Sequence, residues 1–328
     1  MNYGLFVTPN PIQICINHDM FAVDLVIKQS LHSEVALINT IGNHIIDGGG
    51  KRLRPALILL SSGLFAPINA QHHQLAAIVE FIHTATLLHD DVVDESALRR
   101  GKSTANHIFG NSASVLVGDF LYSRAFQMMV KLQNSRVMEV LSDATNVISE
   151  GEVLQLLNVH NADVTEQEYL KVIRYKTAKL FEAAARLGAV INHACNDDEN
   201  ALALYGMHLG TAFQLVDDVL DLSGDVNQIG KNLGDDLSEG KPTLPLLYAM
   251  QKSAPSDAII IRNAIRAGGL TELASVLATV ESTNACEYVM KLAKVESDTA
   301  CDAIKHLPDS VYKQALMDLA NFAITRDH

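Results

Sequence analysis

The sequence predicts an all-α protein, and three observations support this class. Hydrophobic residues make up 48% of its 328 residues, which is enough to bury a sizeable core. Tryptophan is absent and aromatic residues reach only 5%, while alanine and leucine are plentiful, a composition that favours packed helices over sheets. Apolar residues recur at helical spacing along much of the chain, and no segment has the pattern of a strand–turn–strand unit.

The periodicity predicts the main helices in chain order, over residues 21–47, 55–65, 71–95, 112–133, 135–158 and 200–222.

The segments between these helices contain recognisable start and stop signals. Gly48–Gly50 ends the first helix, and Arg99–Lys102 forms a basic turn after the third. Thr165 and Glu168 have the spacing of a capping box, so another helix is expected to begin there. A glycine-rich, charged loop is expected over 223–241.

Domain organisation and compartment follow from simpler features. Residues 1–20 are expected to form a poorly defined N-terminal segment and residues 21–328 one domain, because the sequence contains no linker. The net charge of −13 argues against a nucleic-acid partner. The four cysteines show no CxxC pair, which favours reduced, buried thiols and a cytoplasmic protein. No stretch has the roughly 20 unbroken apolar residues that span a bilayer, and Pro9 and Pro11 interrupt any signal peptide.

Two acidic motifs carry the chemistry, DDVVD at 90–94 and DDVLD at 217–221. In each motif the first and last aspartates are spaced i, i+4 and therefore share one face of a helix, where like charges repel. A hard divalent cation with oxygen ligands removes this repulsion. Each motif ends an apolar helix, so we expect two carboxylate clusters that face one cavity.

Magnesium is the expected cation, with a diphosphate as its other ligand, because Mg²⁺ usually binds a few carboxylates together with phosphate oxygens and water. Lysine and arginine would complete the diphosphate site. Glycines 48–50 beside Lys51 are consistent with a backbone-lined anion pocket. Arg52 and Lys179 are interpreted as solvated surface charges. The other candidate cations are Lys51, Arg54, Arg99, Arg100, Lys176, Lys231 and Lys241.

The sequence resembles a known family, the trans-polyprenyl diphosphate synthases. It is most similar to the bacterial octaprenyl branch of that family, which supplies the ubiquinone side chain. The resemblance runs from about residue 20 to the C-terminus. The segments that carry it are GGGKRLRP at 48–55, FIHTATLLHDDVVDESALRRG at 81–101, GNSASVLVGDFLYSRAFQMM at 110–129, EGEVLQL at 150–156, KTAKLFEAA at 176–184, GTAFQLVDDVLD at 210–221 and GDDLSEGKPTLPL at 234–246.

The resemblance implies a single-domain bundle of antiparallel helices around a deep central cavity, usually as a homodimer. It also implies repeated condensation of isopentenyl diphosphate onto an allylic diphosphate such as farnesyl diphosphate, with about two or three Mg²⁺ ions per site.

Roles carry over position by position. Metal ligands would be Asp90, Asp94, Asp217 and Asp221, with Asp91 and Asp218 in support. Allylic diphosphate contacts would be Arg99, Lys176 and Lys231, and Lys241 is a further cation for substrate. Isopentenyl diphosphate contacts would be Lys51, Arg54, His83 and Arg100. Thr177 and Gln214 would lie near the reacting carbons.

Chain length is expected to depend on residues below the first motif. Ala85 and Thr86 lie five and four residues before Asp90, and both are small, so a growing chain can pass them. By resemblance, Met129 and Leu141 would form a floor further down. A long product, most consistent with octaprenyl diphosphate, is therefore predicted.

Three other functions share part of this pattern. A terpene cyclase also has an aspartate-rich helix end, but its second metal motif is normally not of the DDxxD type, whereas both motifs of this chain are. A metal phosphohydrolase is suggested by His89–Asp90, but it needs further spaced histidines. A non-catalytic subunit of a synthase heteromer would usually have lost an aspartate motif, and both are present here.

Overall fold

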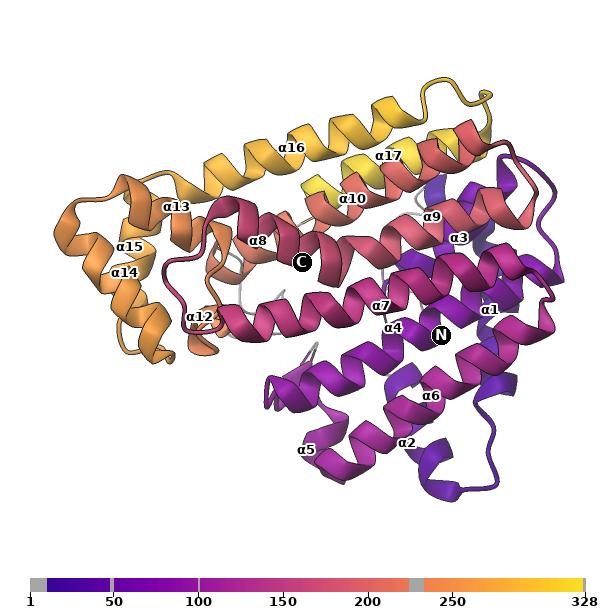
Figure 1. The fold of residues 1–328 in the computed structure, drawn as a ribbon, viewed down its shortest axis with the longest axis horizontal. Helices are drawn as coiled ribbons and strands as arrows, with labels where there is room; N and C mark the ends of the chain where they lie inside the picture. Colours follow the sequence, from indigo (N-terminus) through magenta and orange to yellow (C-terminus); the bar gives the residue numbers. More distant parts are fainter. Residues whose placement is uncertain (1–10, 48–49, 100, 224–232, 327–328) are drawn as a thin grey trace. The chain divides into compact units, whose positions relative to one another are not determined.

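The computed structural model describes residues 11–47, 50–99, 101–223 and 233–326 of the chain (Figure 1). The described residues are overwhelmingly helical, which confirms the all-α class. The helices are α1 (Pro11–Leu31), α2 (Ala36–Asp47), α3 (Leu53–Gly63), α4 (Ala70–Val93), α5 (Ala105–Phe109), α6 (Asn111–Lys131), α7 (Ser135–Asn158), α8 (Glu166–Ile173), the π-helix η1 (Arg174–Ala178), α9 (Lys179–Ile191), α10 (Asn196–Ser223), α12 (Asp235–Ser238), α13 (Leu244–Lys252), α14 (Pro255–Ala267), α15 (Leu273–Ser282), α16 (Ala285–Ala303) and α17 (Val311–Thr325).

The N-terminal part differs from the prediction, because α1 and α2 replace one expected helix over 21–47. Helix α1 begins at Pro11, where the fixed φ of proline suits the first helical position. A turn separates the two helices: Asn39 accepts a hydrogen bond from the Ser33 backbone N–H at 3.0 Å and donates one to the Ser33 carbonyl at 2.7 Å. Apolar periodicity continues across this turn, so it gave no sign of the break.

Helix boundaries elsewhere follow the local signals. Helix α7 has the predicted bounds. The predicted capping box begins α8, since Thr165 accepts a hydrogen bond from the Glu168 N–H at 3.2 Å and the Glu168 carboxylate accepts one from the Thr165 N–H at 2.8 Å. Asn69 caps α4 in a similar way, with His72 in the reciprocal role.

Several short elements were not predicted. Strands β1 (Leu98–Arg99) and β2 (Lys102–Ser103) pair antiparallel around the basic turn, where Gly101 has a φ of 72° that suits glycine. Two residues are too few to show strand periodicity. Helix α12 lies within the expected loop over 223–241, whose residues 224–232 are outside the described part of the chain.

The chain forms two compact units, and their boundaries fall inside helices α7, α9, α10, α16 and α17 rather than in linkers. Unit 1 consists of Met1–Thr145, Leu180–Gly206 and Ala303–Leu319. In it, α4 packs against α1, α3 and α6 (Figure 1). Fully buried side chains such as Leu75, Ile78 and Ile82 hold α4 in this core, and each contributes about 1.5–3 kcal/mol of burial free energy. This packing fixes the helix end that carries the first aspartate motif.

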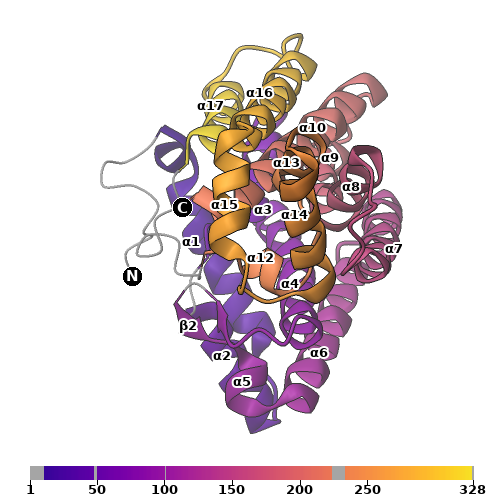
Figure 2. The same cartoon turned by 90° about the vertical axis from the view of Figure 1, so that its left-hand side faces the viewer.

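Unit 2 consists of Asn146–Lys179, Met207–Asp302 and Ala320–His328. Helices α12, α13, α14 and α15 form one group in it (Figure 2), and α13 also packs against α8. An apolar cluster that includes Tyr169, Leu215, Val216 and Val219 lies around the part of α10 that leads into the second aspartate motif.

Two predictions about the whole chain can be compared with the structure. No helix among the described residues is long and apolar enough to cross a membrane. The cysteines are less buried than expected, since Cys195 is exposed and the other three are only half-buried.

Candidate functional site

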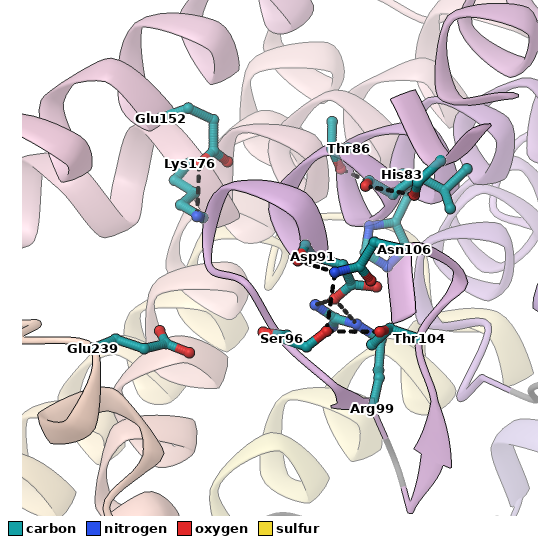
Figure 3. Close-up of polar contacts among 12 residues, drawn as sticks. His83, Thr86, Asp91, Ser96, Arg99, Thr104, Asn106, Glu152, Lys176 and Glu239 are labelled. Carbon is teal, nitrogen blue, oxygen red and sulfur yellow. Dashed lines mark hydrogen bonds and ion pairs between the residues drawn. The ribbon is translucent and has the colours of Figure 1, made fainter. Parts of the chain in front are cut away.

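The first aspartate motif ends α4 in unit 1, and its three carboxylates are not equivalent. Asp90 and Asp94 are partly exposed, whereas Asp91 is buried at 5% exposure. Arg99 donates to the Asp91 carboxylate at 2.8 Å through Nε, and its second nitrogen lies 2.7 Å from the same oxygen (Figure 3). Asn106 donates to the Asp91 carbonyl at 2.9 Å. Asp91 and Arg99 therefore hold the motif in place, and Asp90 and Asp94 present the accessible carboxylates.

Arg54 and His83, both predicted to bind isopentenyl diphosphate, lie together in unit 1. The Arg54 guanidinium is 3.0 Å from Nε2 of His83 and lies over the Phe181 ring at 4.4 Å from its centroid. Lys51, predicted for the same ligand, is partly exposed next to the start of α3. A planar guanidinium suits a diphosphate because it donates hydrogen bonds to phosphate oxygens, and His83, which accepts a hydrogen bond from Arg54 at Nε2, helps to hold the guanidinium in place.

Arg52 is not the solvated surface charge that the sequence suggested. Its guanidinium forms an ion pair with Glu80 of α4 and lies 3.9 Å from Asp24 of α1, and its side chain is only 11% exposed. Arg52 has a left-handed φ of 48° and is the residue before α3. The pair therefore attaches the segment before α3, which includes Lys51, and the start of α3, which includes Arg54, to the same helix as His83.

The second aspartate motif ends α10 in unit 2 and repeats the division of roles. Asp218 is buried at 3% exposure, and it accepts hydrogen bonds from the Tyr169 hydroxyl at 2.5 Å and from the Gln214 amide at 2.8 Å. Burial, followed by the negative charge of Asp236, raises the pKa of Asp218 well above its ordinary value. Burial likewise raises the pKa of the Tyr169 hydroxyl. Asp217, in contrast, is 41% exposed at its side chain.

The outer carboxylates of this motif have partners of their own. Asp217 forms an ion pair with Arg326 at 2.5 Å, and Arg326 also donates to the Phe213 carbonyl at 2.7 Å. The Asp221 carboxylate accepts a hydrogen bond from the Asp236 backbone N–H at 3.4 Å. Substrate or metal at Asp217 would therefore compete with the Arg326 guanidinium.

Lys176 and Thr177 lie on the π-helix η1, a rare element that often occurs at functional sites. Lys176 forms an ion pair with Glu152 of α7 at 2.6 Å (Figure 3). Gly151 allows α7 and η1 to approach closely, because a Cβ atom there would lie 2.6 Å from the backbone nitrogen of Lys176. Thr177 donates to Gln214 at 3.0 Å, so two residues predicted near the reacting carbons are in direct contact.

Three further predicted cations have different outcomes. Lys241 forms an ion pair with Glu239 and donates its backbone N–H to the Asp236 carbonyl at 2.9 Å. Arg100 and Lys231 lie outside the described residues, so their predicted contacts stay predictions.

The predicted chain-length residues all belong to unit 1. Ala85, Met129 and Leu141 are 0%, 1% and 0% exposed. Thr86 donates to the His83 carbonyl at 2.8 Å. Ala85 on α4, Met129 on α6 and Leu141 on α7 are therefore buried within unit 1, and the contacts of these residues and Thr86 with a growing chain stay a prediction.

His89, which suggested a metal phosphohydrolase, is directed toward α6. Its ring nitrogen lies 3.2 Å from the Val115 carbonyl and 3.4 Å from Asp119, and a Cβ atom at Gly118 would be 2.3 Å from it. This position gives no support to a histidine-based metal site.

The donor set can be tested against magnesium. Within the described part of the chain, no three histidine, cysteine, aspartate or glutamate side chains converge on one point that could hold a metal ion. Each motif instead offers two partly exposed carboxylates one helical turn apart. This set fits Mg²⁺, which binds a few carboxylates and takes its remaining ligands from phosphate and water.

Sequence reasoning missed four residues that contact predicted site residues. Glu152 lies in the segment EGEVLQL and could have been assigned from it. Asn106, Tyr169 and Arg326 gave no signal, because each acts on a motif through a contact that only folding creates.

Known proteins resemble this chain over most of its length. Residues 35–281 match the family model "Polyprenyl synthetase". The chain is 52% identical to octaprenyl diphosphate synthase of Escherichia coli, over 94% of this chain and 96% of that protein. It is 45% identical to all-trans-nonaprenyl-diphosphate synthase (geranyl-diphosphate specific) of Rhodobacter capsulatus, over 95% and 96%. A polyprenyl synthase from Caulobacter crescentus, complexed with calcium and isoprenyl diphosphate, has a similar structure, with a TM-score of 0.94, 42% identity and 98% coverage of both chains.

Proposed function

Because this chain belongs to the polyprenyl synthetase family, it is a prenyltransferase, and we propose that it extends farnesyl diphosphate with isopentenyl diphosphate to octaprenyl diphosphate. Membership of this family also argues against the terpene cyclase and phosphohydrolase alternatives. The observation that carries the proposed activity is the shared design of the two motifs, in which a buried middle aspartate fixes the helix end and the outer two remain partly exposed.

The proposed cofactor is Mg²⁺ at Asp90, Asp94, Asp217 and Asp221, where it would neutralise the diphosphate that leaves the allylic substrate. The calcium complex of the Caulobacter relative supports a divalent cation in this family. The carboxylates of this chain would hold the cation against the diphosphate, and Arg99, Lys176, Lys231 and Lys241 would add positive charge to it.

The second substrate, isopentenyl diphosphate, would bind Lys51, Arg54, His83 and Arg100. Arg54 and His83 are already oriented together, so little side-chain entropy is lost when a diphosphate binds them. Thr177 and Gln214 would contact the reacting carbons, and the apolar interior would exclude water from the carbocation. The released diphosphate would accept the proton, because no side chain in the proposed site is an obvious base.

Product length is the part on which the relatives differ, since one makes octaprenyl and another nonaprenyl diphosphate according to their names. The greater identity to the octaprenyl enzyme supports octaprenyl diphosphate here, and the buried Met129 and Leu141 are the proposed floor.

A homodimer is also proposed. Helix α7 exposes Val153, Leu156 and Leu157 at 57%, 61% and 70%, and these residues share one helix face. Helix α6 exposes Leu116 at 66% and Val130 at 63%. Exposed apolar residues that share one helix face, as on α7, are typical of protein interfaces. Light scattering of the purified protein tests this, and a monomer at micromolar concentration would contradict it.

The deciding experiment incubates the purified protein with Mg²⁺, farnesyl diphosphate and labelled isopentenyl diphosphate, and sizes the dephosphorylated products by chromatography. We expect octaprenol as the main product and none after chelation of the metal. Another main length would correct the product, and no prenyl product at all would contradict the function. A cytoplasmic location and a role in ubiquinone synthesis complete the proposal, and cell fractionation and quinone analysis of a deletion strain test them.

A further inference from the structure

Asp218 is the centre of a hydrogen-bond network in unit 2. Its side chain is almost completely buried, and each carboxylate oxygen has its own donor: Gln214 Nε2 reaches Oδ1 at 2.8 Å, and the Tyr169 hydroxyl reaches Oδ2 at 2.5 Å. Both oxygens are therefore engaged by protein groups.

The network extends from Asp218 to the π-helix. Since Gln214 Nε2 donates to Asp218, Gln214 Oε1 is left to accept, and the Thr177 hydroxyl donates to it at 3.0 Å. The orientation of the Gln214 amide, and with it the direction of the Thr177 hydroxyl, thus depends on where the Asp218 carboxylate is held.

Tyr169 is well suited to hold that carboxylate. It is 5% exposed on α8, and its ring packs in the apolar cluster with Leu215, Val216 and Val219 of α10. The capping box at Thr165 fixes the start of the same helix. A tyrosine ring has only two rotatable side-chain bonds, so packing of the ring fixes the position of its hydroxyl.

We propose that Tyr169 is a positioning residue for prenyl transfer, which through Asp218 fixes the Gln214 amide and the Thr177 hydroxyl at the reacting carbons. This inference rests on the proposed function, in which Thr177 and Gln214 contact those carbons. Tyr169 itself touches no substrate in this scheme.

The test is Tyr169→Phe, which removes only the hydroxyl. We expect kcat to fall by about tenfold, the effect of one lost buried hydrogen bond, while KM for each diphosphate changes by less than about twofold. Tyr288→Phe is the matched control, because its hydroxyl also donates to a carboxylate of the same unit, Glu166 at 3.0 Å, and its ring also packs on a neighbour. The control should leave kcat unchanged. An unchanged kcat in Tyr169→Phe would overturn the proposal.

A purely structural role is separated by a double-mutant cycle and by metal binding. In a Gln214→Ala background, Tyr169→Phe should cause no further fall in kcat, whereas independent effects would multiply and overturn the proposal. Calorimetric affinity for Mn²⁺ with inorganic diphosphate should stay within about twofold, because Asp217 and Asp221 are unchanged. A large loss of affinity would show that Tyr169 acts on the metal site instead.

An unfolded variant and an inactive wild-type enzyme would each give a clear result. If Tyr169→Phe is unfolded at the assay temperature, Asp218→Asn, which keeps the side-chain shape, should show the same loss confined to kcat, and a loss confined to KM would overturn the proposal. If the wild-type enzyme makes no prenyl product, the proposed function fails, and the positioning role fails with it. An active wild type with an unaffected Tyr169→Phe sinks the positioning role alone.

Discussion

Replacement of Arg54 by alanine is the sharpest test of the proposed isopentenyl diphosphate site. Two contacts hold the guanidinium in place, the ring of Phe181 at 4.4 Å and Nε2 of His83 at 3.0 Å. The group is thus pre-organised to donate hydrogen bonds to a phosphate. Loss of one hydrogen bond to a charged ligand costs about 1.5–3 kcal/mol, which corresponds to a rise in KM of about ten- to a hundredfold.

The assay measures initial rates with labelled isopentenyl diphosphate at saturating farnesyl diphosphate, and then with the two substrates exchanged. We expect the rise in KM for isopentenyl diphosphate only. Arg54→Lys should give an intermediate value, because it keeps the charge but loses the planar fork. Arg124→Ala is the control, since this arginine also lies over an aromatic ring in unit 1, Phe120 at 4.8 Å, but outside the proposed site. Equal increases for both substrates would refute the assignment of Arg54.

Three further predictions concern the metal, the product and the fold. Asp90→Ala or Asp217→Ala should abolish turnover, because each removes a proposed metal ligand. The circular dichroism spectrum should stay unchanged, because each also relieves a like-charge repulsion. Turnover near the wild-type rate at saturating Mg²⁺ would contradict the metal assignment. Ala85→Phe should shorten the product, since a ring cannot fit in a fully buried alanine site without blocking the passage, and Met129→Ala should lengthen or broaden it; chromatography of the dephosphorylated products decides both. Glu80→Ala removes the close ion-pair partner of the buried Arg52 guanidinium and leaves it only the more distant Asp24, at 3.9 Å. The free energy of unfolding should fall by about 3 kcal/mol in urea titrations, and a loss below about 1 kcal/mol would show that the pair with Glu80 contributes little.

Local order in the sequence accounts for most of the fold. Helical periodicity located α3, α4, α6 and α7 within a few residues, because each buries one apolar stripe and the 3.6-residue repeat records that stripe. The capping box at Thr165 was also predictable, because its two partners, Thr165 and Glu168, lie only three residues apart. The break between α1 and α2 was not, because the bonds between Ser33 and Asn39 interrupt a periodicity that continues through them.

For the aspartate motifs, too, local spacing predicted part of the arrangement, and contacts with distant residues decided the rest. Their i, i+4 spacing by itself set apart Asp90 from its neighbour Asp91, because positions one residue apart point about 100° away from each other on a helix. The spacing did not show what the buried aspartates would bond.

Only the tertiary structure decided which cations are engaged and by what. The sequence suggests a surface charge for Arg52, whereas in the structure it forms an ion pair with Glu80. Lys176 likewise forms an ion pair with Glu152 of another helix. Tyr169 and Arg326 reach the second motif from elements distant in the chain. A sequence records the chemistry of each residue and its neighbours within a turn or two, whereas contacts between distant segments depend on how buried helix faces pack, and that is a property of the whole fold.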